Sequence, residues 1–272
     1  MTTPRSLLAL LALPGTVALL FFFGLPLAVL VGESASEGSG AVSRLFADPL
    51  FWRGLRGSLV LGLVAPALSL VVGFCVARHL ARKPPAQRQA YLFVISLPLT
   101  FSGLIIAYGF ILAFGRAGFF TLLLAELGAD PAVVGSAIYS PAGLAIAYAY
   151  YLIPRVVLVL LPALANFDQR QLEAAESLGA GRFAVLRDVL LPQIAPAALA
   201  AFCLTSAVAI GAYGTALALV GTQVNILPLL LYSKISESGS DFPAAAALSV
   251  VLLALCTAIM AGAELLARRR PA

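Results

Sequence analysis

Charge is what this sequence has least of. Charged residues make up 11% of its 272 residues and apolar residues 61%, whereas a soluble domain has about 25% and about 45–50%. So few charges cannot cover the surface of a soluble domain, and that class is excluded. Several apolar stretches exceed the roughly 20 residues that cross a bilayer. The composition therefore predicts a helical membrane protein with several spans.

Residues that bind phosphate or catalyse reactions are also scarce. The chain has two lysines, Lys83 and Lys234, and neither follows a glycine, so a G-x-x-x-x-G-K-[ST] phosphate loop is excluded. The one histidine, His79, lies in a basic turn and is best interpreted as a surface residue near lipid headgroups. No nucleophile–base set and no pair of carboxylates lies within the apolar stretches. We predict no catalytic residues and no enzymatic activity, which makes the chain a conduit driven by an energy source elsewhere.

The cysteines do not indicate a disulfide or a metal site. Cys75, Cys203 and Cys256 all lie inside apolar stretches, where free buried cysteine is the ordinary interpretation. Their spacing suggests neither a disulfide pair nor a set of metal ligands. We therefore expect no metal site.

Six apolar segments are long enough to be membrane spans, which predicts an all-α fold with about six transmembrane helices. The first is about twice as long as the 7–15-residue apolar region of a cleaved signal peptide, so a retained anchor is favoured. Pro98 and Gly103 break the third. The apolar run at 227–232 is too short to cross, and we expect it to lie at the interface or to dip in and return. With no internal repeat and no linker, residues 1–272 are predicted to form a single transmembrane domain. The predicted spans are residues 7–31, 53–80, 90–114, 141–165, 193–220 and 243–267.

The distribution of basic residues predicts the orientation. Six spans put both termini on one side, together with the 78–88 turn and the 168–192 segment. These regions hold eleven Lys and Arg residues, whereas the loops 32–52, 115–140 and 221–242 and their edges hold five. Because cytoplasmic loops are enriched in Lys and Arg, we predict a multi-pass membrane protein with both termini in the cytoplasm.

A polar island, residues 168–192, interrupts the later apolar stretches. Asp168 is a candidate N-cap, and Gln171 follows at the spacing of a capping box. Gly179 and Gly181 are typical of a helix end, and Pro192 favours the start of a new helix. One apolar stripe is formed by Leu172, Ala175 and Leu178, and a second by Phe183, Leu186 and Val189. The island is thus predicted to fold as a helix, a glycine turn and a second short helix.

One charge lies deep inside a predicted span. Arg155 follows Pro154 about ten residues from the span's cytoplasmic end, or roughly 15 Å at helical rise. Such a charge usually faces a bundle interior or a polar cavity, which would make Arg155 a pathway residue or a subunit contact. Equally, its side chain could reach back to the lipid headgroups. The small and hydroxyl residues of spans three and five either pack helices or line a route. The candidate pathway residues are Tyr108, Arg155, Thr205, Tyr213 and Thr215.

The polar island also carries a sequence pattern. Glu173-Ala174-Ala175, with Gly179 six residues after the glutamate, is followed by Val189, Leu191 and Pro192. This resembles the signature E-A-A-x-x-x-G, nine variable residues, I/V-x-L-P, of the permease subunits of binding-protein-dependent ABC importers of type I fold. Span number extends the resemblance over residues 55–265. Leu186 departs from the pattern, since an aromatic residue is common there, and we expect only an adjustment of packing.

The resemblance implies a coupling function for residues 168–192. They would form a helix that sits in a groove of a cytoplasmic ATPase subunit, so this chain would bind no cofactor and the partner would hold ATP and magnesium. The implied assembly has two ATPase subunits, a second permease subunit that is identical or paralogous, and an extracytoplasmic solute-binding protein. The resemblance implies that it lies in a lipid membrane, the bacterial inner membrane, and binds no nucleic acid. The implied coupling residues are Asp168, Glu173, Ala174, Ala175, Gly179, Leu191 and Pro192.

The solute is less constrained. The run 211–221 and the six-span length look like the group of permeases that import polyamines, iron(III), thiamine, phosphonates or opine-like solutes, and a polyamine is the first expectation. A cationic solute fits poorly with Arg155 on the path, so an anionic or zwitterionic solute competes with it. Two other classes remain alternatives: a secondary transporter driven by an ion gradient, which often shows repeated halves and buried acids, and a membrane scaffold without transport.

Overall fold

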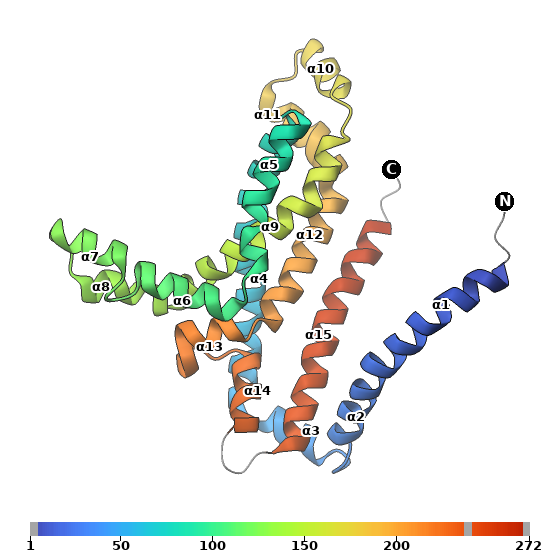
Figure 1. Ribbon diagram of the computed structural model, residues 1–272, viewed down its shortest axis with the longest axis vertical. Coiled ribbons are helices and arrows are strands. Elements are labelled where there is room, and N and C mark those ends of the chain that lie inside the picture. Colours follow the sequence, from blue (N-terminus) through green and yellow to red (C-terminus); the bar gives the residue numbers. More distant parts are fainter. Residues whose placement is uncertain (1–4, 237–240, 269–272) are drawn as a thin grey trace. The chain divides into compact units, whose positions relative to one another are not determined.

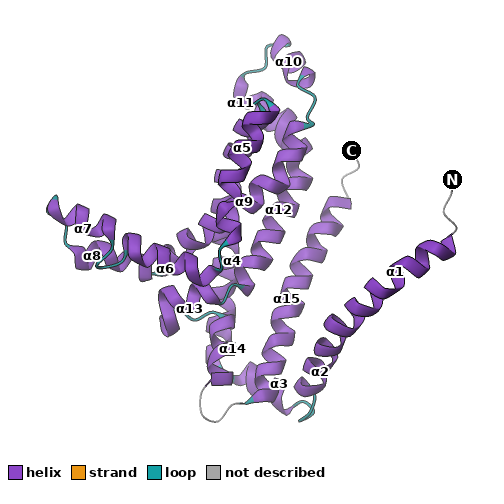
Figure 2. Cartoon of the chain, viewed as in Figure 1, coloured by secondary structure: helices purple, strands orange, loops and turns teal. Residues whose placement is uncertain are grey.

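The computed structural model describes residues 5–236 and 241–268, and every regular element in this part of the chain is a helix (Figures 1 and 2). The all-α prediction is confirmed. The longer helices are α1 (Arg5–Leu19), α2 (Leu25–Ser34), α4 (Pro49–Ala81), α5 (Pro85–Ser96), α6 (Gly103–Phe114), α9 (Pro141–Ala165), α12 (Leu191–Gly211), α14 (Leu227–Ser236) and α15 (Phe242–Arg268). The shorter elements are η1 (Leu20–Gly24), α3 (Gly40–Ala47), η2 (Leu97–Thr100), α7 (Phe119–Glu126), α8 (Pro131–Ser136), η3 (Ala137–Tyr139), α10 (Arg170–Ser177), α11 (Arg182–Ala184), η4 (Val185–Leu190), α13 (Gly214–Val220) and η5 (Gly221–Gln223).

Six helical segments are long and apolar enough to cross a membrane, as predicted. They are Ala12–Ser34, Pro49–Ala81, Gly103–Glu126, Pro141–Ala165, Arg182–Gly211 and Phe242–Gly262. The fourth has the predicted bounds. It begins where the Ser140 hydroxyl accepts a hydrogen bond from the Gly143 amide (3.1 Å), which is the geometry of an N-cap.

The third and fifth spans differ from the predicted ranges. Residues 85–96 form α5, which is separated from α6 by residues 97–102, and the third spanning segment joins α6 to α7. The fifth ends at Gly211, because Ala212 is extended (φ −75°, ψ 103°), and a new helix starts at Gly214. The continuous apolar composition of 193–220 concealed this break. The segments predicted as loops also contain helices, namely α3, α7, α8 and α14.

The chain falls into two compact units. The larger, Arg53–Leu229 with Leu255–Ala272, contains most of α4, the helices α5 to α13, and the 168–192 segment. Its two apolar clusters centre on α9 and the helices beside it, with Tyr148, Leu152 and Leu160 fully buried. The expectation of a single permease domain stays an expectation.

The smaller unit consists of the described residues of Met1–Trp52 and Leu230–Ala254. Arg44 of α3 pairs with Glu37 (2.7 Å) and with Asp241 (3.3 Å), while Asp241 accepts a hydrogen bond from the Ala244 amide at the start of α15 (3.1 Å). Burial acts to raise the pKa of Asp241, but the Ala244 amide and the Arg44 guanidinium outweigh it and lower the pKa. Lys234 forms a further ion pair with Asp48 (3.5 Å).

Glycines allow close helix packing in the larger unit. A Cβ atom on Gly57 of α4 would overlap the Asn225 carbonyl oxygen, and one on Gly73 would lie 2.6 Å from Val156 of α9. Small residues at such contacts let backbones approach each other in membrane helix bundles. Gly57 and Gly73 therefore let α4 pack closely against the 223–226 segment and against α9.

Candidate functional site

The 168–192 segment is ordered by its own backbone and side chains. The Asp168 carboxylate accepts a hydrogen bond from the Arg170 amide (3.0 Å) at the start of α10. The helix ends in two hydrogen bonds, from the Ala180 amide to the Ala175 carbonyl (3.1 Å) and from the Gly179 amide to the Glu176 carbonyl (3.0 Å). This pair defines a Schellman turn, which requires a left-handed residue at its centre. Gly179 supplies it with φ +86°, so the predicted glycine turn is confirmed.

The capping box predicted with Gln171 does not form. The Gln171 side-chain oxygen instead accepts a hydrogen bond from Nε2 of Gln193 in the first turn of α12. The amide side chain is long enough to reach the neighbouring helix, and the Asp168 carboxylate already satisfies an amide at the helix start. The bond connects α10 to α12 across 22 residues of sequence.

The second half of the segment is a continuation of a span. Residues 182–211 form one unbroken helix, so the prediction of a separate short helix and a new start at Pro192 was wrong. The turns Val185–Leu190 have π-helical hydrogen bonding. Pro192 lacks an N–H, and a wide π turn before it changes the hydrogen-bond register without ending the helix. Leu191 and Pro192 are both exposed.

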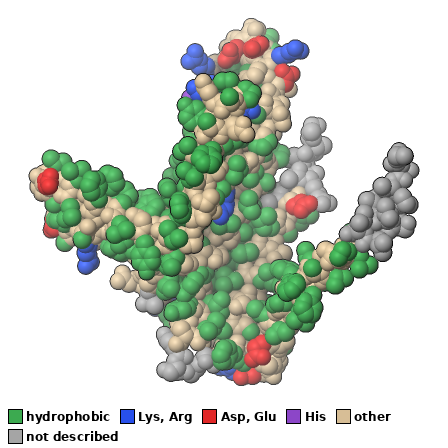
Figure 3. Space-filling view, viewed as in Figure 1, with side chains coloured by type: hydrophobic (Ala, Val, Ile, Leu, Met, Phe, Trp, Pro, Cys, Tyr) green, Lys and Arg blue, Asp and Glu red, His purple; other side chains and the backbone are tan. Residues whose placement is uncertain are grey.

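One side of α10 packs on the protein and the other is free. Leu172 packs against the apolar cluster of α9 and α12, whereas Glu173 and Ala174 are exposed and Ala175 is half-buried. Leu178 and Phe183 flank the glycine turn and have relative solvent accessibilities of 90% and 73%, although both belonged to the predicted apolar stripes. Acidic and basic side chains gather at the α10 end of the molecule (Figure 3).

A polar cavity of about 400 Å³ lies inside the larger unit, among α6, α9, α12 and α13. Arg155 and Tyr151 of α9 line one side, and the start of α6 and the α12–α13 break line the other. Its lining residues are Pro98, Phe101, Ser102, Gly103, Leu104, Ile106, Tyr151, Arg155, Val208, Gly211, Ala212, Gly214 and Thr215.

The α12–α13 break is stabilised by hydrogen bonds from neighbouring helices. The Tyr148 hydroxyl donates to the Ala212 carbonyl (2.6 Å), which satisfies an acceptor that the end of α12 leaves free. The Thr215 hydroxyl donates to the Gly103 carbonyl (3.0 Å). A Cβ on Gly103 would overlap that hydroxyl, so the two helix starts meet because residue 103 has no side chain.

Arg155 is the charged group of this cavity. It is half-buried, its Nη1 donates to the Tyr151 carbonyl (2.8 Å), and its guanidinium lies 5.4 Å from the centre of the Tyr151 ring. No carboxylate in the described ranges forms an ion pair with it. The structure thus places Arg155 at a cavity within the helix bundle.

The predicted pathway residues are only partly brought together. Thr215 lines the cavity with Arg155, and Tyr213 lies in the adjoining break. Thr205 is buried and donates to carbonyls of its own helix, and Tyr108 is exposed further along α6. Sequence reasoning missed Tyr151, for which the available signal was its position one helical turn before Arg155 on the same face.

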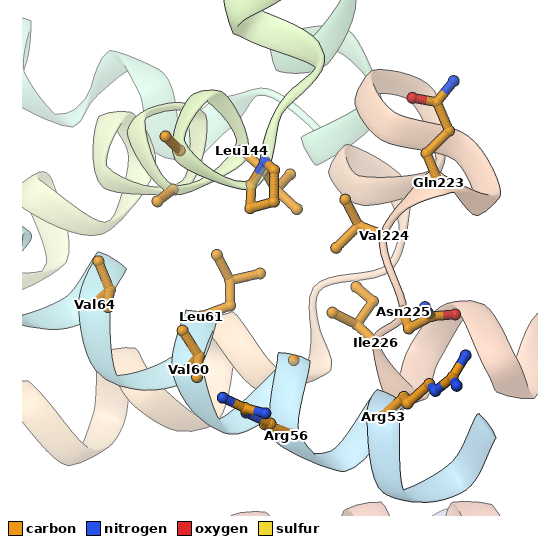
Figure 4. A pocket seen from close by; sticks show the side chains of 14 residues that line it. Arg53, Arg56, Val60, Leu61, Val64, Leu144, Gln223, Val224, Asn225 and Ile226 are labelled. Atoms are coloured by element: carbon orange, nitrogen blue, oxygen red, sulfur yellow. The ribbon is translucent and has the colours of Figure 1, made fainter. Parts of the chain in front are cut away.

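A second cavity, of about 530 Å³, is mainly apolar (Figure 4). Apolar side chains of α4 point toward Leu144, while Val224 and Ile226 close the side formed by the 223–226 segment. Arg53 and Arg56 of α4 supply its charged groups. Two more cavities, of about 580 and 570 Å³, are lined largely by aromatic and aliphatic residues of α6, α7 and α9.

The exposed 168–192 segment and the polar cavity both lie in a region that matches a known protein family. Residues 69–270 match the family described as binding-protein-dependent transport system inner membrane component. The chain belongs to this family. The match contains the whole 168–192 segment and most of the predicted core at 55–265.

Relatives of this permease carry names with two different solutes. The chloroplastic sulfate permease 2 of Chlamydomonas reinhardtii is 31% identical over 214 residues, which are 78% of this chain and 56% of that protein, so the chain spans little more than half of that relative's length. The sulfate transport permease CysW of Synechocystis is 27% identical over 87% of this chain and 84% of its own. The spermidine/putrescine permease PotB of Escherichia coli is 27% identical over 86% of this chain and 88% of its own.

The fold of the permease is also found in a solved transporter. A chain of a bacterial alginate ABC transporter, crystallised with an alginate-bound periplasmic protein, superposes with a TM-score of 0.78 over 97% of this chain and 94% of its own, at 19% identity. A second alginate transporter structure gives a TM-score of 0.74. These structures show the importer permease fold, and the family match and the relatives show that the chain is a multi-pass inner-membrane permease subunit of an ABC importer.

Proposed function

We propose that this permease forms the solute pathway of an importer and that residues 168–192 transmit the conformational changes of a separate ATPase to that pathway. The observation that carries the proposal is the free side of α10. Glu173 and Ala174 are exposed there, and Leu178 and Phe183 add two large apolar side chains. An exposed apolar patch rimmed by polar residues marks a protein contact. The charge distribution of the loops supports a cytoplasmic location for it.

The family description supports the assembly that we propose. A binding-protein-dependent system needs a solute-binding protein, and the proposed complex adds a second permease subunit and two ATPase subunits that hold ATP and magnesium. Both termini of this chain lie in the cytoplasm in this proposal. The exposed Ala174 leaves room for the backbone of α10 to approach the ATPase, and Glu173 offers it a carboxylate. The solute is small and polar or charged, and the relatives support both a polyamine and sulfate.

The test reverses one charge on α10 and compares it with its neighbour. Glu173 and Glu176 are both exposed on the same short helix, so Glu176→Lys is the matched control for Glu173→Lys. We expect Glu173→Lys to lower co-purification of the ATPase and ATP-driven uptake about tenfold or more, which is the effect of losing a charged hydrogen bond at an interface, and Glu176→Lys to change both much less.

Two outcomes would contradict the proposal. Equal behaviour of the two charge reversals would remove the coupling assignment from Glu173. Uptake that survives ATP depletion but collapses with the ion gradient would instead support a secondary transporter.

A further inference from the structure

The polar cavity contains an unpaired positive charge within a membrane span. Arg155 lines it and contacts the carbonyl and ring of Tyr151. A charged side chain at membrane depth usually faces a cavity or pairs with an opposite charge. Because no acidic side chain of the described segments pairs with Arg155, the cavity has an excess of positive charge.

A second donor of the cavity has no acceptor. Tyr151 is only 6% exposed, lines the cavity, and its hydroxyl is buried without a hydrogen-bond partner among the described residues. Thr215 lies close to it, but no hydrogen bond of standard geometry joins the two hydroxyls, and Thr215 donates to the Gly103 carbonyl instead. A buried polar group without a partner is costly, and an acceptor in the cavity would remove that cost.

The third source of donors is the start of α6, a helix of 12 residues. The Ser102 side chain accepts from the Ile105 amide (3.4 Å), and the Ser102 carbonyl accepts from the Ile106 amide (3.1 Å). The Gly103 and Leu104 amides have no partner within the helix, and both residues line the cavity. The amino end of a helix carries a partial positive charge and free N–H groups, which favour an anion.

We propose that this cavity binds the transported solute and that the solute is a small oxyanion. The proposal rests on the importer function proposed above and adds the chemical class. Arg155, the Tyr151 hydroxyl and the amides of Gly103 and Leu104 are all hydrogen-bond donors, and an oxyanion offers several acceptor oxygens to them. The cavity volume of about 400 Å³ is within the usual range of small-molecule sites, about 300–1,000 Å³. A polyamine would bring ammonium groups against the guanidinium.

The experiment uses the complete transporter in proteoliposomes, with its ATPase, second permease subunit and binding protein. Radiolabelled sulfate and phosphate are the oxyanion probes, and radiolabelled spermidine is the cationic comparison. We expect ATP-driven uptake of at least one oxyanion and none of spermidine. Arg155→Gln should lower oxyanion uptake about tenfold or more, and Arg155→Lys should lower it less because the charge remains.

Removal of one hydroxyl gives a matched pair of variants. Tyr151→Phe deletes the unpaired donor, whereas Tyr150→Phe deletes a hydroxyl from the preceding residue of α9, which is exposed and does not line this cavity. We expect uptake to fall several-fold in Tyr151→Phe and to stay unchanged in Tyr150→Phe. Stimulation of ATP hydrolysis by the binding protein should persist in Tyr151→Phe, which shows that the assembly is folded and coupled.

Failure of this inference is distinguishable from failure of the importer function. Uptake of spermidine, or of neither oxyanion, by the wild type overturns the solute class, while sensitivity to Glu173→Lys still supports coupling. Loss of the permease pair in Arg155→Gln makes Arg155 a subunit contact and also overturns the proposal. If Arg155→Gln does not insert into the membrane, Arg155→Lys and Tyr151→Phe still test the proposal. Both should lower oxyanion uptake, and wild-type uptake in both would overturn it.

Discussion

Gly179 gives the sharpest test of the coupling function proposed for residues 168–192, because the effect of replacing it can be worked out from backbone geometry. Its φ of +86° lies in the left-handed region, and the turn it makes ends α10. An L-residue in that region costs roughly 1–2 kcal/mol. No atom lies within 4 Å of the position that a Cβ on Gly179 would take, so a clash adds nothing and the penalty is conformational.

Gly181 is a matched control two residues away. It is also exposed and has open space where a Cβ would lie, but its φ of −68° is one that any residue adopts. Gly181→Ala should therefore be neutral or slightly stabilising, since it restricts the unfolded chain. Gly179→Ala should lower the ratio of native to non-native turn about 5- to 30-fold, the factor that corresponds to about 1–2 kcal/mol.

The assay is ATP-driven uptake by the reconstituted transporter, together with co-purification of the ATPase. We expect Gly179→Ala to weaken both and Gly179→Val to weaken them further, because a β-branched residue tolerates positive φ less well. Gly181→Ala should resemble the wild type. Equal activity of the Gly179 and Gly181 variants would refute the argument that the left-handed turn sets the geometry of the ATPase contact.

Two further predictions concern stability. Ser58→Ala removes the acceptor of the buried Leu227 amide (2.9 Å) and should lower the free energy of unfolding by about 1–3 kcal/mol. Ser69→Ala is the control and should cost much less, because the Ser69 hydroxyl donates to a carbonyl of its own helix. Thermal unfolding in detergent compares the two variants, and equal losses of stability would contradict the argument. Because the pKa of Asp241 is lowered, its ionised form stabilises the protein above its ordinary pKa of 3.8, and this contribution is lost as the pH falls below that value. Thermal unfolding against pH should therefore show a smaller loss in Asp241→Asn than in the wild type, and identical profiles would show that the contact with Arg44 contributes nothing.

The elements that local chemistry determines were predictable from the sequence. The span at 141–165 is bounded by a proline start and a polar end, and the structure gives α9 these bounds. The turn at Gly179 was equally local, since glycine at a helix end takes positive φ at little cost. In both cases the decisive interactions lie within a few residues of each other.

The cavity could not be predicted in the same way. Its lining comes from α6, α9 and the α12–α13 break, and the bond from Thr215 to Gly103 joins residues 112 positions apart. The break is stabilised by Tyr148, whose hydroxyl donates to the Ala212 carbonyl, while the residues around the break keep the apolar composition of a continuing span. Periodicity in one segment carries no information about a partner on another helix.

Residues 168–192 and the polar cavity are joined by one helix. Residues 182–211 form a continuous helix of 30 residues, about 45 Å at 1.5 Å per residue, longer than the roughly 30 Å hydrocarbon core. Its first turns contact α10, and its last residue, Gly211, lines the cavity. In the proposed mechanism, a displacement of α10 would pass along this helix to Gly211. The backbone departs from α-helical hydrogen bonding at Val185–Leu190, which contacts α10, and Pro196 inside α12 has no N–H to donate to the preceding turn. Both features lie in the half of the helix that begins at Arg182, so we expect the helix to bend there, between the proposed ATPase contact and the residues that line the cavity.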